Sequence, residues 1–259
     1  MEPQLQIQDL TKQFDGIIAV KDVGMEVQKK AIVSIIGPNG AGKTTLFNLV
    51  TGFYIPDHGN ILLDGLALQG LSPHKITRAG IARTFQNIRL FPWMTVRDNI
   101  IVARQVKCSG GFLGACFQTP LVRREEKATL EKVQEIMTYF QLQDKWNYQA
   151  KNLPYGEQRK LEIARALATE PKILLLDEPT AGMNPSESKE CVELIFRVNE
   201  TLGITIILIE HNMNVVMGIS EKIFVLDHGM KIAEGSPEEI QSNRDVIRAY
   251  LGEDYATHA

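Results

Sequence analysis

The 259-residue sequence has little of what marks several large classes of protein. Its three cysteines, Cys108, Cys116 and Cys191, are odd in number and have no metal-ligand spacing, which indicates free thiols in a reducing compartment. No apolar run approaches the ~20 residues that cross a bilayer. The first residues also lack the basic start and apolar stretch of a signal peptide. We therefore expect a chain that is soluble by itself, with any membrane role supplied by a partner.

The sequence also lacks a strong excess of charge of either sign. Its formal net charge is −3, with 23% charged and 44% apolar residues, the proportions of an ordinary globular protein. A chain that bound nucleic acid or anionic lipid through its overall charge would need a basic surface, so no nucleic-acid partner is predicted. There is no internal repeat and no low-complexity tract, and the length suits one large domain.

Three apolar runs predict buried strands, at residues 31–36, 173–176 and 204–209. They are continuous rather than alternating and rich in Ile, Val and Leu, which is typical of parallel strands covered on both faces. Helical stretches separate the runs, so an α/β core with a mostly parallel sheet is predicted. Before the first of these runs, Leu5 and Ile7, and then Val23, Met25 and Val27, alternate with polar neighbours, and a turn at Asp64-Gly65 after the short apolar run 61–63 favours a hairpin. These features predict an N-terminal antiparallel β subdomain.

Helices are predicted where apolar residues recur every three to four positions. Residues 87–153 contain no second buried strand run, and residues 123–142 have an amphipathic pattern, so a helical subdomain is predicted to interrupt the core. Asn184-Pro185 resembles the start of another helix, and Ser-Pro-Glu-Glu from Ser236 is a capping box. The expected division is a catalytic core at 1–86 and 154–235, a helical subdomain at 87–153 and a C-terminal helical tail at 236–259. The predicted buried stripes are Leu130, Val133, Met137 and Phe140 in the first helix, and Val192, Ile195, Phe196 and Leu202 in the second.

A phosphate-binding loop follows the first buried run directly and precedes a helical pattern. This G-x-x-x-x-G-K-[ST] sequence stands in the strand–loop–helix context that the motif requires, which argues against a glycine-rich turn that binds nothing. Its glycines let backbone N–H groups turn toward phosphates, Lys43 would reach the β and γ phosphates, and Thr44 would hold Mg²⁺. The predicted ATP-binding residues here are Gly37, Pro38, Asn39, Gly40, Ala41, Gly42, Lys43, Thr44 and Thr45.

Two carboxylates end the second buried run, at Asp177 and Glu178. The carboxyl end of a parallel strand is where an open α/β sheet places ligand groups. Asp177 suits a Mg²⁺ shell and Glu178 a general base that acts on the attacking water. The alternative is a capping or surface salt-bridge pair; the position directly after a buried strand, in a chain that already has a phosphate loop, argues against it.

With these motifs the sequence resembles the ATP-binding-cassette (ABC) ATPases over nearly its whole length. Gln86 resembles the family's Q-loop glutamine, His211 its switch histidine, and Phe14 the aromatic residue that stacks on adenine. The family's signature segment (L-S-G-G-Q) corresponds to Leu153, Pro154, Tyr155, Gly156 and Glu157. Its D-loop corresponds to Ala181, Gly182, Met183 and Asn184.

The resemblance implies roles for these residues. Gln86 would join the Mg²⁺ shell, and His211 would contact the γ-phosphate and position the water. Phe14 could instead be an ordinary core aromatic. The signature departs from the family pattern, since Pro154 replaces a serine and Tyr155 a glycine. Gly156 is kept, so a backbone N–H can still approach a phosphate bound by the partner subunit.

The closer resemblance is to the ATPases of bacterial branched-chain amino-acid importers, carried by Thr84-Phe85-Gln86-Asn87, Glu210-His211-Asn212-Met213 and residues 246–252. It implies ATP and Mg²⁺, a second ATPase subunit of the same or a homologous chain, membrane permeases, and indirectly a periplasmic binding protein. The location implied is the cytoplasmic face of the inner membrane. Importers of other amino acids, urea or amides, and ABC ATPases outside transport, remain alternatives. Residues 109–120 are either a self-anchored loop or, with residues 86–94, a permease-docking surface.

Overall fold

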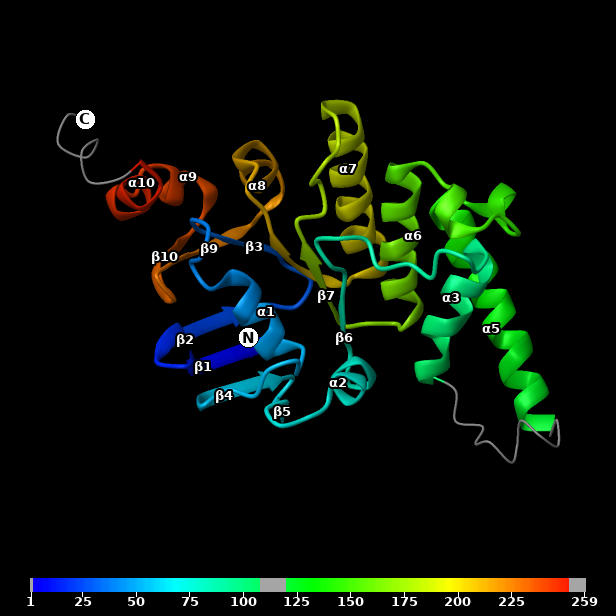
Figure 1. Ribbon diagram of the computed structural model, residues 1–259, viewed down its shortest axis with the longest axis horizontal. Helices are drawn as coiled ribbons and strands as arrows, with labels where there is room; N and C mark the ends of the chain where they lie inside the picture. The colour runs from blue at the N-terminus through cyan, green and yellow to red at the C-terminus, as the bar shows by residue number, and fades with distance from the viewer. Residues whose placement is uncertain (1, 108–119, 252–259) are drawn as a thin grey trace. The chain divides into compact units, whose positions relative to one another are not determined.

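The computed structural model describes residues 2–107 and 120–251, and these form two compact units (Figure 1). The first unit joins Met1–Arg83 to Lys172–Ala259, and the second is Thr84–Pro171. The sequence-based division returned to the core at residue 154. Helix α6 (Tyr155–Ala168) packs on two helices of the second unit, so the compact first unit resumes only at Lys172. Cys108, Cys116 and most of the 109–120 segment lie outside the described residues.

The first unit is built on a six-stranded sheet with the order β10-β9-β3-β8-β7-β6. Neighbouring strands are parallel except β10, which runs antiparallel to β9. Every residue of β3, β7 and β8 is buried, which confirms the three runs predicted as strands covered on both faces. The strands are β3 (Ile32–Ile36), β6 (Ile81–Arg83), β7 (Ile173–Asp177), β8 (Thr205–Ile209), β9 (Lys222–Asp227) and β10 (Met230–Gly235).

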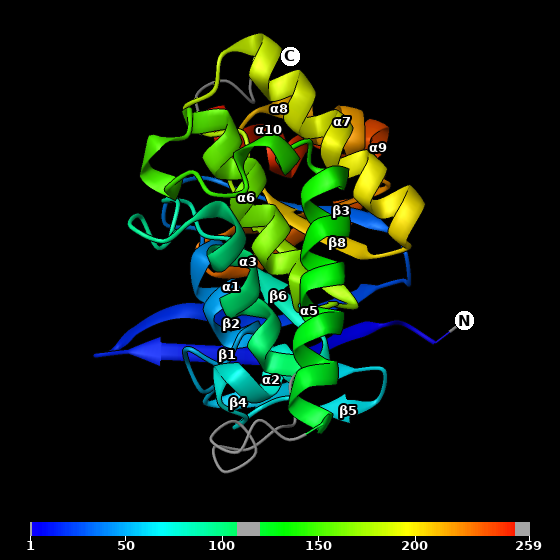
Figure 2. The ribbon, with the colours of Figure 1, turned by 90° about the vertical axis from the view of Figure 1, so that its right-hand side faces the viewer.

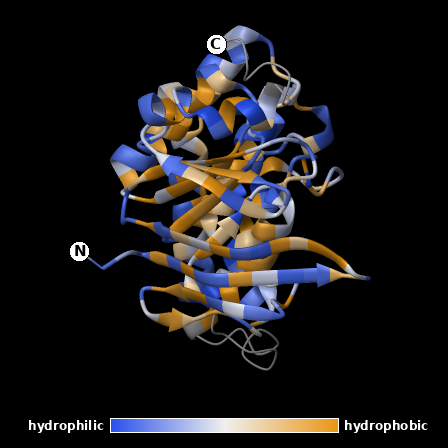
Figure 3. Ribbon diagram, turned by 90° about the vertical axis from the view of Figure 1, so that its left-hand side faces the viewer, coloured by the Kyte–Doolittle hydropathy of each residue, from blue (hydrophilic) through white to orange (hydrophobic). Residues whose placement is uncertain are grey.

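A smaller antiparallel sheet in the same unit has the order β2-β1-β4-β5, as the alternating N-terminal pattern predicts. Apolar and polar bands alternate along its strands (Figure 3). Asp64 and Gly65 turn the chain between β4 and β5 with φ of 47° and 79°, so the predicted hairpin is confirmed. The strands are β1 (Leu5–Phe14), β2 (Ile17–Val27), β4 (His58–Leu63) and β5 (Leu66–Ala67).

Helix α1 (Lys43–Val50) joins the two sheets into one core. Its Leu46 and Phe47 lie in a buried cluster with Leu10 of the small sheet and Ile35 of the large one. A second cluster lies on the large sheet around Ile36, where three C-terminal helices contribute apolar residues. These helices are α8 (Met213–Ile219), α9 (Pro237–Gln241) and α10 (Arg244–Leu251), and the predicted capping box starts α9 at Ser236. Helix α2 (Pro73–Ala79) buries Ile76 in the first cluster.

Helix α7 (Pro185–Leu202) follows the D-loop and carries a complete capping box. The Asn184 side chain accepts from the Glu187 backbone, and the Glu187 side chain accepts from the Asn184 backbone. The predicted stripe of this helix was wrong in part, because Phe196 and Leu202 are exposed. The buried positions follow a stripe displaced around the helix: Cys191, Leu194, Ile195 and Val198.

Replacing Asn184 by alanine is expected to lower the free energy of unfolding by ~1 kcal/mol, because α7 loses a satisfied first-turn N–H. Ser72→Ala is the matched control. Ser72 occupies the corresponding position before α2, but its side chain makes no capping hydrogen bond to the helix backbone. Chemical denaturation of both variants measures the difference, and equal losses would contradict a specific role for the Asn184 cap.

In its described residues the second unit contains helices joined by loops, and no strand of either sheet (Figure 2). Helices α3, α5 and α6 pack on one another and bury Ile100, Val133, Met137 and Leu161. The stripe predicted for this region holds for Val133 and Met137 of α5 and for Phe140 just after it. It is wrong for Leu130, which is exposed, while Thr129 and Ile136 are buried. The elements are α3 (Val96–Arg104), η1 (Gln105–Lys107), α5 (Pro120–Tyr139), η2 (Gln143–Lys145), η3 (Ala150–Asn152) and α6. Nowhere in residues 2–107 and 120–251 does a helix have the length and apolar character needed to cross a membrane.

Candidate functional site

The phosphate loop leaves β3 at Ile36 and enters α1 at Lys43, as predicted. Gly37 and Gly42 have φ of 150° and 98°, a region that side chains disfavour. A Cβ at Gly37 would lie 2.0 Å from the Leu226 carbonyl oxygen, and one at Gly42 would lie 2.4 Å from that of Ala19. Because neighbouring backbone leaves no room for a side chain at either position, the loop can close around a ligand only with glycine there.

The N-terminus of α1 suits an anion. No acidic residue occurs in its first turn, so the partial positive charge of the helix end is uncompensated. Thr44 and Thr45 lie in this turn, and the buried Lys43 ammonium donates to the carbonyl oxygens of Gly37 (2.7 Å) and Pro38 (2.9 Å). Burial lowers the Lys43 pKa, and the charges of Glu178 and Asp177 oppose that change. The loop, the lysine and both carboxylates therefore belong to one electrostatic site.

Asp177 ends β7 as a buried ion pair. Its Oδ2 lies 2.7 Å from Nη2 of Arg83, the last residue of the neighbouring strand β6. Arg83 Nη1 also donates to the Asn48 side chain on α1, at 2.7 Å. The guanidinium thus holds the carboxylate against the helix that follows the phosphate loop. No role was predicted for Arg83 from the sequence. Its position directly before Thr84-Phe85-Gln86 could have indicated a place near the predicted site.

Glu178 and His211 meet across the ends of β7 and β8. The His211 Nε2 atom lies 2.9 Å from Glu178 Oε1, and the Glu178 backbone N–H donates to the Ile209 carbonyl at 2.9 Å. Glu178 has a φ of 47°, a strained conformation for a residue with a side chain. The structure therefore brings the predicted base and the predicted switch histidine into direct contact.

Residues 181–184, predicted as the D-loop, form the turn between Glu178 and α7. The Ala181 N–H donates to the Glu178 carbonyl at 3.1 Å, and Gly182 has a φ of 76°. The Met183 N–H donates to the Thr180 carbonyl at 3.2 Å, and Asn184 caps the helix. The turn is thus fixed at both ends.

Phe14 lies at the end of β1 with an exposed ring, so the alternative of a core aromatic is not supported. Its ring meets that of Tyr54 edge to face at 5.0 Å between centroids, and Lys12 Nζ lies 5.4 Å from its centroid. An accessible aromatic pair offers a stacking surface to a base. Adenine stacking on Phe14 stays a prediction.

The donor set fits a Mg²⁺ held jointly with phosphates. Among residues 2–107 and 120–251, no group of three His, Cys, Asp or Glu side chains is placed to hold a metal ion by itself. Mg²⁺ is commonly bound through one or two protein oxygens together with waters and substrate phosphates. Thr44 and Asp177 supply such oxygens in the first unit, whereas Gln86 belongs to the second.

In the second unit, Gln86 lies on a loop that a buried ion pair of α6 holds by its backbone. Arg159 donates to the Phe85 carbonyl (2.9 Å), the Gln86 carbonyl (3.0 Å) and Glu162 Oε2 (2.7 Å). Glu162 Oε1 accepts from the backbone N–H groups of Arg89 and Phe85. Burial raises the Glu162 pKa, against the charge of Arg159. No structural role was predicted for Arg159 or Glu162 from the sequence.

The predicted signature segment starts the same helix. Leu153 is buried, Pro154 is the N-cap, and α6 begins at Tyr155 with no side-chain cap. Glu157, in place of the family's glutamine, forms an ion pair with Lys145. The signature segment and the Gln86 loop are therefore attached to one helix, at its start and through Arg159.

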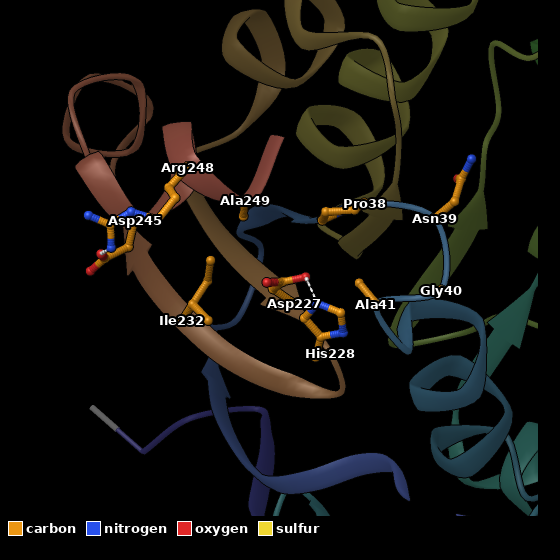
Figure 4. A pocket seen from close by; sticks show the side chains of 10 residues that line it. All are labelled: Pro38, Asn39, Gly40, Ala41, Asp227, His228, Ile232, Asp245, Arg248 and Ala249. Atoms are coloured by element: carbon orange, nitrogen blue, oxygen red, sulfur yellow. Dashed lines mark hydrogen bonds and ion pairs between the residues drawn. The ribbon is translucent and has the colours of Figure 1, made fainter. Parts of the chain in front are cut away.

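A pocket of about 780 Å³ lies beside the phosphate loop (Figure 4). One wall is formed by Pro38 and the loop residues after it, another by Arg248 and Ala249 of α10, and Asp227 and His228 lie between them. The C-terminal helix thus lines the same pocket as the phosphate loop, which the sequence did not predict.

Two family models match the chain. One, described as ABC transporter, matches residues 20–181, and the other, described as branched-chain amino acid ATP-binding cassette transporter, matches residues 230–256. The second match includes β10, α9 and α10, and so contains the helix that lines the pocket beside the phosphate loop.

Whole-chain comparisons agree with these matches. The chain is 48% identical over 252 residues to the high-affinity branched-chain amino acid transport ATP-binding protein LivG of Escherichia coli, covering 97% of this chain and 99% of that one. It is similar to a crystal structure of an ABC transporter cassette in its ADP conformation (TM-score 0.84, 30% identity, 98% and 100% coverage). It is also similar to a dimeric post-hydrolysis cassette bound to ADP and phosphate (TM-score 0.74, 25% identity, 90% and 98% coverage).

Proposed function

Because this chain belongs to the ABC transporter family of ATPases, we propose that it is the ATP-hydrolysing subunit of an importer for branched-chain amino acids. The observation that carries the solute assignment is the near full-length likeness to LivG. The match of residues 230–256 to a branched-chain amino acid transporter model supports the same assignment. The solute itself would contact other subunits, so site chemistry in this chain supports hydrolysis and the likeness supports the solute.

We assign hydrolysis to the groups gathered at the ends of β3, β7 and β8. The phosphate loop and Lys43 bind the phosphates of ATP, where the helix end and the ammonium offset their charge. Glu178 accepts a proton from the attacking water, and His211, in contact with it at 2.9 Å, orients the water and the γ-phosphate. Asp177 and Thr44 would hold Mg²⁺, which when bound neutralises charge on the β and γ phosphates. Phe14 and Tyr54 offer the adenine surface.

The proposed site is completed by a second ATPase subunit. The dimeric cassette similar to this chain supports such an assembly, which would be formed by a second copy or a LivF-like homologue. In that assembly the start of α6, from Leu153 to Glu157, faces the ATP of the partner. With Pro154 in place of serine, backbone N–H groups and the helix end supply this contact. Gln86 would report the bound state to the helical unit.

We further propose that the chain works at the cytoplasmic face of the inner membrane, bound to permease subunits that a periplasmic binding protein supplies with solute. The division into a catalytic core at 1–86 and 154–235, a helical subdomain at 87–153 and a C-terminal tail at 236–259 remains the functional proposal. The docking surface is proposed for residues 86–94, where Phe91 and Trp93 are exposed.

Uptake by cells that lack this chain tests the proposal. We expect loss of leucine, isoleucine and valine uptake, restored by the wild-type chain but not by Lys43→Ala, which removes the charge that binds the phosphates. Urea uptake serves as the control and should be unchanged. Loss of urea or amide uptake with normal leucine uptake would move the assignment to another solute. Normal uptake of all solutes, with no permease copurifying, would indicate an ABC ATPase outside transport.

A further inference from the structure

Glu210, the residue between β8 and His211, is a buried carboxylate to which the proposed reaction gives no part. Only 3% of its surface is exposed. Its Oε1 accepts from the Thr180 backbone N–H at 3.0 Å and from the Thr180 hydroxyl at 2.7 Å. Its Oε2 accepts from the His211 backbone N–H at 3.1 Å. Charge-assisted bonds of this kind are about twice as strong as neutral ones, so the carboxylate holds both residues firmly.

These bonds join the two chain segments that carry Glu178 and His211. Thr180 lies two residues after Glu178, and His211 directly follows Glu210. The Glu178 backbone N–H donates to the Ile209 carbonyl at 2.9 Å. The two segments are therefore also joined by a backbone hydrogen bond. The contact between His211 Nε2 and Glu178 Oε1, at 2.9 Å, therefore lies inside a closed ring of hydrogen bonds.

The orientation of Glu178 within this ring of hydrogen bonds depends on Glu210. Glu178 adopts a strained φ of 47°, so its orientation must be maintained by the backbone around it. Thr180 also begins the turn that contains Ala181, Gly182 and Met183. A single carboxylate thus connects the switch histidine, the general base and the predicted D-loop, all within the first unit.

We propose that Glu210 is a positioning residue that sets the geometry of Glu178 and His211 and couples the histidine to the D-loop. It acts through its hydrogen bonds and does not touch the substrate. The proposal rests on the assignment of hydrolysis to Glu178 and His211.

Glu210→Gln is the primary test. The amide keeps the size of the side chain but has one oxygen, so either Thr180 or His211 loses its acceptor. Because small misplacements of a catalytic group cost up to ~10²-fold in rate, we expect kcat for ATP hydrolysis to fall roughly 10- to 100-fold with an unchanged KM for ATP. Glu221→Gln is the matched control, since Glu221 also accepts a backbone N–H, from Ile32, but at the other end of the sheet. It should hydrolyse ATP at the wild-type rate.

Two substitutions at Thr180 keep the test informative if Glu210→Gln does not fold. Thr180→Val removes the hydroxyl donor and should lower kcat, whereas Thr180→Ser retains it and should restore the rate. Stoichiometric ATP binding, measured by isothermal titration, gives the folded fraction of each variant. Loss of kcat only in proportion to the folded fraction would overturn the proposal, as would a wild-type kcat in both Glu210→Gln and Thr180→Val.

The test separates this inference from the function on which it rests. If Glu178→Gln hydrolyses ATP normally, the assignment of the base fails, and Glu210 has no pair to position. If Glu178→Gln is inactive and Glu210→Gln is fully active, the assignment of the base stands and only the role of Glu210 is overturned.

Discussion

Glu178→Gln is expected to stop steady-state ATP hydrolysis while leaving ATP bound. Glutamine keeps the size of the side chain and can still meet His211, but it cannot accept a proton from water. A general base contributes about 10²- to 10⁴-fold to such a reaction, so the rate of phosphate release should fall by that factor. Lys43 and the phosphate loop are unchanged, so ATP affinity should be retained. Release of labelled phosphate in single-turnover experiments measures the rate.

Trapped ATP should also stabilise the paired subunits, because closure depends on binding and reopening on hydrolysis. Gel filtration with ATP and Mg²⁺ should therefore show more dimer for Glu178→Gln than for the wild type. Glu193→Gln, on the exposed face of α7, is the control for a carboxylate-to-amide change and should behave as the wild type. Phosphate release by Glu178→Gln at the wild-type rate would show that another group is the base.

Arg159→Met is expected to lower the free energy of unfolding of the second unit by about 3–5 kcal/mol, the cost of leaving one member of a buried ion pair without the other. Arg159 and Glu162 have side chains only 1% and 5% exposed. The substitution also removes the donors to the Phe85 and Gln86 carbonyls. Both tryptophans of the chain, Trp93 and Trp146, lie in this unit, so their fluorescence during urea denaturation reports its unfolding separately.

The loss of stability caused by Arg159→Met should depend on pH in a definite direction. Burial already raises the Glu162 pKa above its ordinary value, and removing Arg159 takes away a charge that opposes the rise. A carboxyl group whose pKa is raised by folding favours the folded state below its unfolded pKa, and that contribution disappears as pH rises through the folded pKa. The Arg159→Met variant should therefore be least stable at neutral pH and regain part of the lost free energy of unfolding as the pH is lowered.

Two further variants define the origin of the effect. Arg159→Met with Glu162→Leu removes both charges and should recover most of the stability, because an apolar pair of similar size replaces the ion pair. Lys132→Met, which breaks an exposed pair with Glu135 on α5, should cost at most ~1 kcal/mol. A double variant as unstable as Arg159→Met alone would show that the backbone bonds to the Gln86 loop, rather than the buried charge, dominate.

Element prediction succeeded where a local pattern was long and consistent. The continuous runs of β3, β7 and β8 and the alternating N-terminal strands are confirmed. Strand β6 is only three residues long and pairs only with β7, so no local pattern identified it. Leu130 and Phe196 show the limit of helical periodicity: the spacing predicts a stripe, but the packing partners decide which of two adjacent stripes is buried.

The sequence by itself determined the phosphate loop, the carboxylates at the end of β7, the fold class and the family, because each depends on residues close together in the chain or on a pattern repeated within one element. Only the tertiary structure decided that Arg83 holds Asp177, that Glu210 ties Thr180 to His211, and that Arg159 holds the Gln86 loop. The bonds from Arg83 to Asp177, from Thr180 to Glu210 and from Arg159 to Gln86 join residues 30 to 94 positions apart. Their donors and acceptors carry no local signature, since a buried charge is recognised only when the groups that satisfy it are known.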